Sequence, residues 1–113
     1  MADVLGTFEQ AVLLALVRPT SGSSDESYGR SILKDVQTRL AREVAAGAVY
    51  ATLERLEEKG LISSRVGPGS DVRGGRQKRF YSVEPQGLKS LNEAKAAVDH
   101  LWSGVPWPLK GTV

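Results

Sequence analysis

The chain contains no cysteine, so neither a disulfide nor a thiolate metal site is available to hold its fold together. Its one histidine, His100, has no cysteine beside it and no partner resembling a nucleophile with its base. The longest apolar run covers residues 11 to 17, far short of the ~20 residues that span a bilayer, and no basic segment precedes it. These gaps argue against an enzyme, a metalloprotein and a membrane protein. They predict a cytoplasmic protein that needs no cofactor.

The net charge is also small, at +2 over 113 residues, but the charged residues are unevenly distributed. Residues 1 to 27 carry one cation against four anions, whereas residues 63 to 83 carry five cations against Asp71. Affinity for nucleic acid depends on how many phosphates are neutralised in one place, so a local basic segment matters more than the sum. A chain of this length buries one modest core. We therefore expect a single core, with double-stranded DNA as the first partner to consider.

Apolar spacing predicts a mostly α-helical fold with a small β-hairpin. The expected helices cover residues 8–17, 28–41, 47–59 and 85–102, and the expected strands cover residues 61–66 and 78–83. Thr7, with Gln10 three residues later, is expected to cap the first helix, and Ser27 is a plausible cap for the second. Gly60 follows the third helix as a left-handed C-cap. This order of elements indicates a winged helix-turn-helix.

The third helix has one apolar side and an opposite side made mostly of small residues. Val49, Leu53 and Leu56 fall within about 60° of one another at 100° per residue, so this stripe should be buried. The opposite side is expected to hold Ala48, Ala51, Thr52 and Arg55. Two alanines, a threonine and an arginine suit a helix that enters the ~12 Å major groove. Arg55 is the candidate for contact with a base edge, against the alternative that it pairs with Glu54 or Glu58.

The predicted hairpin carries the cation cluster. Its members are Arg73, Arg76, Lys78 and Arg79, beside two glycines that let the backbone approach phosphates closely. Alternation along the strand puts Lys78 and Phe80 on one face with Arg79 and Tyr81 on the other, so the four cations cannot all meet DNA alike. Tyr50, at the edge of the third helix, either donates to a phosphate oxygen or packs its ring on the second helix.

The last helix repeats apolar residues near the spacing of a helix-packing seam. The predicted dimerisation residues are Leu88, Leu91, Val98, Leu101 and Trp102. Trp102 and Trp107 could also line a small-molecule pocket at the dimer interface, because flat apolar ligands stack on indole rings. The preferred interpretation is that Trp102 packs in the interface and Trp107 belongs to a loose tail. We therefore divide the chain into a winged helix-turn-helix domain at 1–84, a dimerisation helix at 85–103 and a flexible tail at 104–113.

Several motifs together resemble the PadR-like transcriptional regulators, specifically the small type with one C-terminal helix. The matching pieces lie at residues 6–9, 13–16, 27–29, 47–61, 74–81 and 85–87. Many members of the family have His-Gly-Tyr where this chain has Ser27-Tyr28-Gly29, and proline where it has Ala51. The resemblance implies a homodimeric DNA-binding repressor whose last helix is exchanged or packed across the dimer.

The leading hypothesis is a sequence-specific homodimeric repressor that binds an inverted-repeat operator and occludes it. Such a protein can respond to a small-molecule inducer, of unknown identity, that favours a dimer geometry unable to match the operator. The alternative is a winged helix that contacts proteins and has no specific DNA site.

Overall fold

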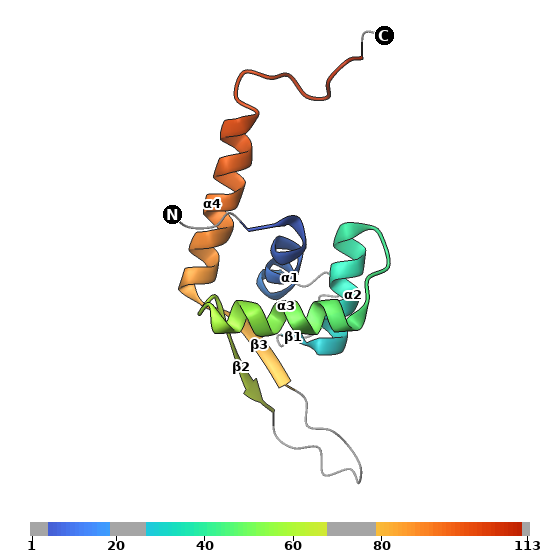
Figure 1. Ribbon diagram of the computed structural model, residues 1–113, viewed down its shortest axis with the longest axis vertical. Helices are drawn as coiled ribbons and strands as arrows, with labels where there is room; N and C mark the ends of the chain where they lie inside the picture. The colour runs from blue at the N-terminus through green and yellow to red at the C-terminus, as the bar shows by residue number, and fades with distance from the viewer. Residues whose placement is uncertain (1–4, 19–26, 68–78, 112–113) are drawn as a thin grey trace.

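The computed structural model describes residues 5–18, 27–67 and 79–111. In this part of the chain the elements are α1 (Thr7–Val17), β1 (Ser27–Tyr28), α2 (Gly29–Leu40), α3 (Ala46–Glu58), β2 (Ile62–Val66), β3 (Arg79–Val83) and α4 (Pro85–Leu101). Figure 1 shows α3 running beneath α1 and α2, with the sheet at one end of this three-helix unit. The predicted helices and the hairpin are confirmed, with most ends shifted by one residue.

One hydrophobic core fills the space between the three N-terminal helices and the sheet. The largest fully buried side chains are those of Val12, Leu13, Ile32, Val36, Val49, Thr52, Leu53 and Leu56. All three members of the apolar stripe predicted for α3 are among them. Because α1, α2 and β2 each bury apolar side chains against α3, the helix is fixed in position and its other side is left for contacts outside the fold.

The start of α1 differs from the sequence prediction by one residue. Gly6, not Thr7, is the N-cap, and its backbone N–H donates to the Glu9 carboxylate at 3.1 Å. The cap therefore uses Glu9, three residues beyond Gly6, instead of the predicted Gln10. A carboxylate accepts more strongly than an amide and also favours the positive end of the helix dipole, which explains the choice.

The end of α3 is the one predicted. Gly60 has a φ of 77°, in the left-handed region where a side chain is strained. The N–H of Leu61 donates to the carbonyl of Leu56 and that of Gly60 to the carbonyl of Glu57, each at 3.0 Å. These two bonds form a Schellman motif, which turns the chain sharply from α3 into β2.

The sheet contains a strand that the sequence pattern did not predict. Its order is β1-β3-β2, with both pairs antiparallel, and Ser27 and Tyr28 lie opposite Tyr81 and Phe80. Ser27 therefore belongs to a strand, and α2 begins only at Gly29. A two-residue strand has no periodicity of its own, so only its distant partner defines it.

Candidate nucleic-acid interface

Over the first half of α3 the outward side carries only very small side chains. Gly47, Ala48 and Ala51 are exposed and carry no side chain beyond a methyl group. Long exposed side chains begin with Tyr50, Glu54 and Arg55. A helix with this profile can bring its backbone close to the base edges in a major groove before its side chains make contact.

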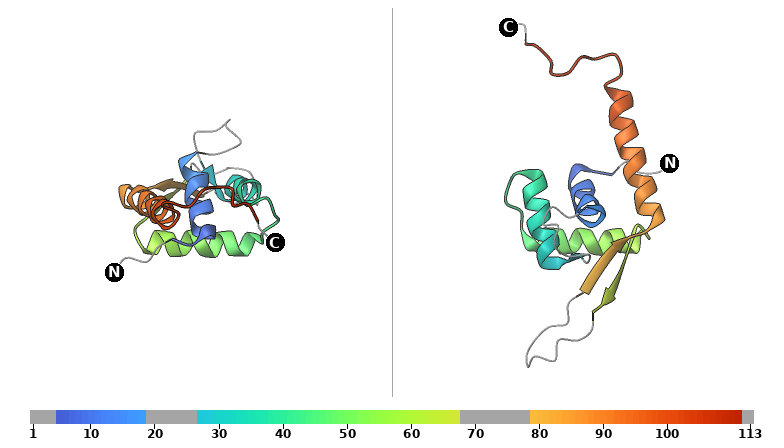
Figure 2. Two further views of the ribbon diagram at one scale, coloured as in Figure 1. Left: turned by 90° about the horizontal axis from the view of Figure 1, so that it is seen from above. Right: turned by 180° about the vertical axis from the view of Figure 1, so that it is seen from behind.

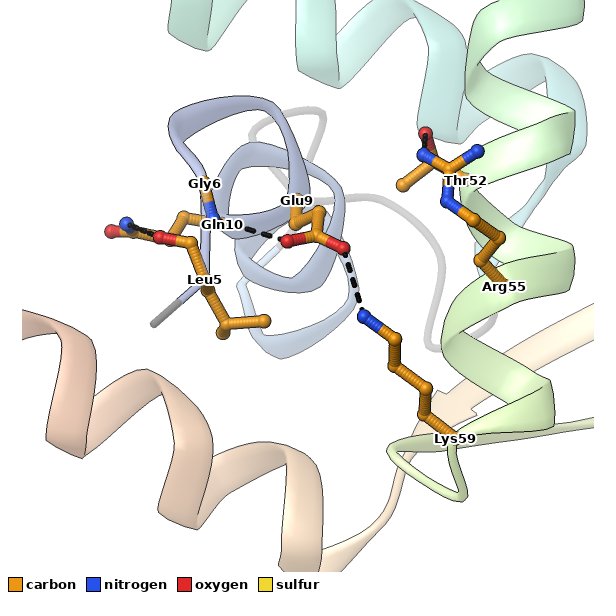
Figure 3. A network of polar contacts seen from close by, with 7 residues as sticks. All are labelled: Leu5, Gly6, Glu9, Gln10, Thr52, Arg55 and Lys59. Atoms are coloured by element: carbon orange, nitrogen blue, oxygen red, sulfur yellow. Dashed lines mark hydrogen bonds and ion pairs between the residues drawn. The ribbon is translucent and has the colours of Figure 1, made fainter. Parts of the chain in front are cut away.

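Thr52 does not belong to this exposed surface, and its predicted placement there is wrong. Only 1% of Thr52 is accessible, and its hydroxyl accepts a hydrogen bond from Arg55 Nη2 at 3.2 Å. At 100° per residue Thr52 lies only about 40° from Leu56, so it falls beside the buried stripe and not opposite it. Its role is to hold the Arg55 guanidinium, as Figure 3 shows.

Arg55 lies on the flank of α3 that faces the start of α1. No ion pair joins it to Glu54 or Glu58 among the described residues, so the alternative foreseen for it is not observed. It borders a hollow of about 460 Å³ together with Phe8, Thr52 and Arg42 from the turn between α2 and α3. Arg42 was missed by the sequence analysis, although an exposed cation directly before a recognition helix is a recognisable signal.

Tyr50 occupies the opposite flank of α3. The residue is 47% exposed, yet its ring and hydroxyl lie so close to Gly29 that a Cβ at that position would collide with them. The ring therefore packs on the first turn of α2, which is one of the two alternatives foreseen. Gly29 is what allows the approach, because any side chain there would occupy the space of the phenol ring.

The hairpin formed by β2 and β3, called here the wing, is linked to α3 by a chain of polar contacts. Arg79 Nη1 donates to the Ser64 hydroxyl at 3.0 Å, and that hydroxyl donates to Glu57 Oε2 at 2.7 Å. On the other face, the Arg65 guanidinium lies 5.0 Å from the centre of the Phe80 ring. The predicted alternation of Arg79 and Phe80 is confirmed, and Arg79 is held between the wing and α3.

Tyr81 lies next to this chain on the same face of the wing. Burial raises the pKa of its phenol above the ordinary value, and the carboxylates of Glu57 and Glu54 raise it further, while Arg79 acts in the opposite sense. The phenol therefore stays protonated at neutral pH and can donate a hydrogen bond. The remaining predicted wing cations, Arg73, Arg76 and Lys78, lie outside the described residues.

A second polar connection joins the start of α1 to the end of α3. Glu9 Oε1 accepts from the backbone of Gly6, and Glu9 Oε2 faces Lys59 Nζ at 3.5 Å (Figure 3). Gln10 Nε2 in turn donates to the Leu5 carbonyl at 2.9 Å. Lys59 is half exposed, so the ion pair itself adds little stability, but it marks where the two helix ends meet.

Helix α4 leaves the rest of the domain with part of its apolar surface uncovered. Leu88, Val98, Leu101 and Trp102 are 43%, 47%, 76% and 38% exposed, whereas Leu91 packs against the core. In the right-hand view of Figure 2 the C-terminal half of α4 stands clear of the three-helix unit. Between α4 and α1 lies a groove of about 440 Å³, whose apolar lining includes Leu14, Val17, Leu91 and Val98.

Two other classes of site find no support in the described ranges. No group of three or more potential metal ligands occurs among residues 5–18, 27–67 and 79–111, and His100 is an exposed residue of α4. No helix within those ranges has the length and apolar character needed to cross a membrane.

Three helices, a wing and an open outer side of α3 define a winged helix-turn-helix. The model of the transcriptional regulator PadR-like family matches residues 21–93, and the chain belongs to that family. The transcriptional regulator Rv3488 of Mycobacterium tuberculosis is 32% identical over 79 residues, which cover 70% of this chain and 69% of that protein.

Solved structures agree with this assignment. A PadR-like transcriptional regulator from Bacillus cereus superposes with a TM-score of 0.68 at 23% identity, over 95% of both chains. A PadR family regulator from Eggerthella lenta gives a TM-score of 0.62 at 26% identity, over 83% of this chain and 76% of that one. The protein is a DNA-binding transcriptional regulator and not an enzyme.

Proposed function

We propose that the protein is a homodimeric repressor that binds an inverted-repeat operator, with α3 in the major groove and the wing along the flanking backbone. The outer side of α3 is the observation that carries this proposal. Its side chains are small at Ala48 and Ala51, and one flank then bears Arg55, the predicted base-contacting cation. Tyr50 on the other flank, and Arg79 on the wing, complete the described part of the proposed contact surface.

The dimer part of the proposal follows from α4. Its exposed residues Val98 and Leu101, with Leu14 and Val17 of α1, form one apolar surface that a single chain leaves in contact with water. Association through this surface under two-fold symmetry would present two copies of α3 about one DNA turn, ~34 Å, apart. A dimer bound over a promoter represses by occupying the DNA that the polymerase needs.

Selection of bound duplexes from a random pool, combined with the mass in solution by light scattering, tests the proposal. The expected result is a dimer at micromolar concentration that enriches an inverted repeat with half-sites one helical turn apart. A pool that remains unenriched, with binding that is insensitive to salt, would favour the alternative of a module that contacts proteins. Counterion release makes salt sensitivity a direct signature of phosphate contacts.

The proposed contribution of the wing is electrostatic and carries little sequence information. Replacing Arg73 and Arg76 by alanine should weaken specific and random DNA binding together. It should also reduce the slope of log affinity against log salt by about one for each phosphate contact that is lost. Lys89→Ala with Lys110→Ala removes the same two charges from α4 and the tail, and serves as the control. Equal slopes in the two double variants would exclude the wing from the phosphate contacts.

A further inference from the structure

We propose that Glu54 is a specificity-determining residue that accepts a hydrogen bond from a cytosine in the major groove. The inference rests on the proposed insertion of α3 into that groove, and it assigns a preferred base to one residue of the helix. Glu54 lies about 130° from the centre of the buried stripe at 100° per residue, on the side of α3 turned away from the core. The residue is exposed and forms no hydrogen bond or ion pair with the described residues.

The neighbours of Glu54 are what single it out. Towards the N-terminus the outward side of α3 carries Gly47, Ala48 and Ala51, which are too short to extend into a groove. Of the two long side chains beside it, Tyr50 lies against Gly29 and Arg55 is hydrogen-bonded to Thr52. Contacts within the fold therefore direct both flanking side chains sideways. Glu54 lies between the outward midline of α3 and Tyr50, near Tyr81 of the wing, and its carboxylate has no hydrogen bond among the described residues.

A carboxylate in that position has a narrow choice of partners. The phosphates repel it, so it gains only where a base offers an N–H group. Guanine presents O6 and N7 in the major groove and thymine presents O4, all of them acceptors. Adenine places the acceptor N7 beside its amino group, whereas cytosine offers its N4 amino group as a donor that suits a carboxylate. The negative charge of Glu54 thus favours cytosine, whose amino group donates to it, and disfavours guanine and thymine, whose acceptor atoms repel it.

Glu58 provides the matched comparison. It is exposed on the same side of α3, one turn further on, at the last residue of the helix. Replacing either glutamate by glutamine removes one negative charge from this side, so both variants should bind random DNA somewhat more tightly. Only the change at Glu54 should alter which base is preferred.

The experiment is duplex selection with the full chain, followed by competition between sites that differ at one base pair per half-site. The wild type should prefer cytosine at one position by about 5- to 150-fold. Glu54→Gln should move the preference at that position to adenine, because glutamine pairs with adenine N6 and N7, and Glu54→Ala should abolish it. Glu58→Gln should keep the wild-type preference at every position.

Two results would overturn the inference, and they differ from each other. A wild type that selects a defined site, with Glu54→Gln selecting the same site at every position, refutes the role of Glu54 while the DNA-binding function stands. A wild type that selects no site refutes the insertion of α3 and Glu54 with it. Thermal unfolding of each variant checks that the fold is intact. Because both glutamates are exposed, neither substitution should lower the unfolding temperature.

Discussion

At the scale of single residues, the proposed interface depends on side chains that the fold holds in place. Tyr50 rests on Gly29, Arg55 on Thr52, and Arg79 on Ser64. Each contact restricts a long side chain before any DNA arrives, which lowers the conformational entropy lost on binding. Of these three, the packing of Tyr50 on Gly29 also joins α3 to the start of α2, so it affects stability as well.

Gly29→Ala should therefore destabilise the fold by about 1 to 3 kcal/mol, since the added methyl group overlaps the phenol ring. Thermal unfolding measures the loss. The same substitution in a Tyr50→Ala background should be much milder, because the colliding atoms are gone, so the two changes should be strongly non-additive. An equal loss in both backgrounds would place the strain in the α2 backbone and not at Tyr50.

At the scale of elements, the sequence predicts most of α3 because its determinants are local. The stripe of Val49, Leu53 and Leu56 gives the buried side, and Gly60 gives the end. The prediction failed at Thr52, which was assigned to the side opposite the stripe although its angle around the helix places it beside Leu56. It failed at β1 for a different reason, because two residues pair only with a strand more than fifty positions away.

The candidate site divides in the same way between local and distant causes. Ala48, Ala51 and Arg55 follow from helical periodicity alone and are found on or beside the outward side. The link from Arg79 through Ser64 to Glu57 depends on how the wing packs against α3, which no periodicity encodes. Arg42 joins Arg55 at one hollow only because the turn after α2 brings it there.

The ends of α3 allow a paired test of backbone conformation. Gly60→Ala should destabilise the fold by roughly 1 to 2 kcal/mol, because an L side chain is strained at the φ of 77° that the Schellman turn requires. Gly47→Ala is the control within the same helix, where nothing lies within 4 Å of an added Cβ. It should leave the stability unchanged or raise it by less than the ~1 kcal/mol of a helix-interior site, because Gly47 is only the second residue of α3. Urea unfolding measures both, and a loss at position 47 as large as at 60 would contradict this account.

At the scale of the whole molecule, the main imbalance is the apolar surface of α4. The sequence alone made Leu91 a member of the dimer seam, but the structure packs it against the core, so charging it would damage the fold itself. Val98 and Leu101, at 47% and 76% exposed, are the residues that a single chain leaves uncovered. An exposed apolar patch of this kind favours association.

Val98→Glu with Leu101→Glu should therefore give a folded monomer that loses specific binding to an inverted repeat but still binds random DNA weakly through one winged helix. The control pair is Ala96→Glu with His100→Glu, which adds the same two carboxylates on the opposite side of α4 and should leave the dimer intact. Light scattering at micromolar concentration gives the mass, and circular dichroism confirms the helices. If the wild type is already monomeric under these conditions and binds a single unrepeated site tightly, two-fold symmetry has no part in recognition, and one copy of α3 with its wing supplies all of the specificity.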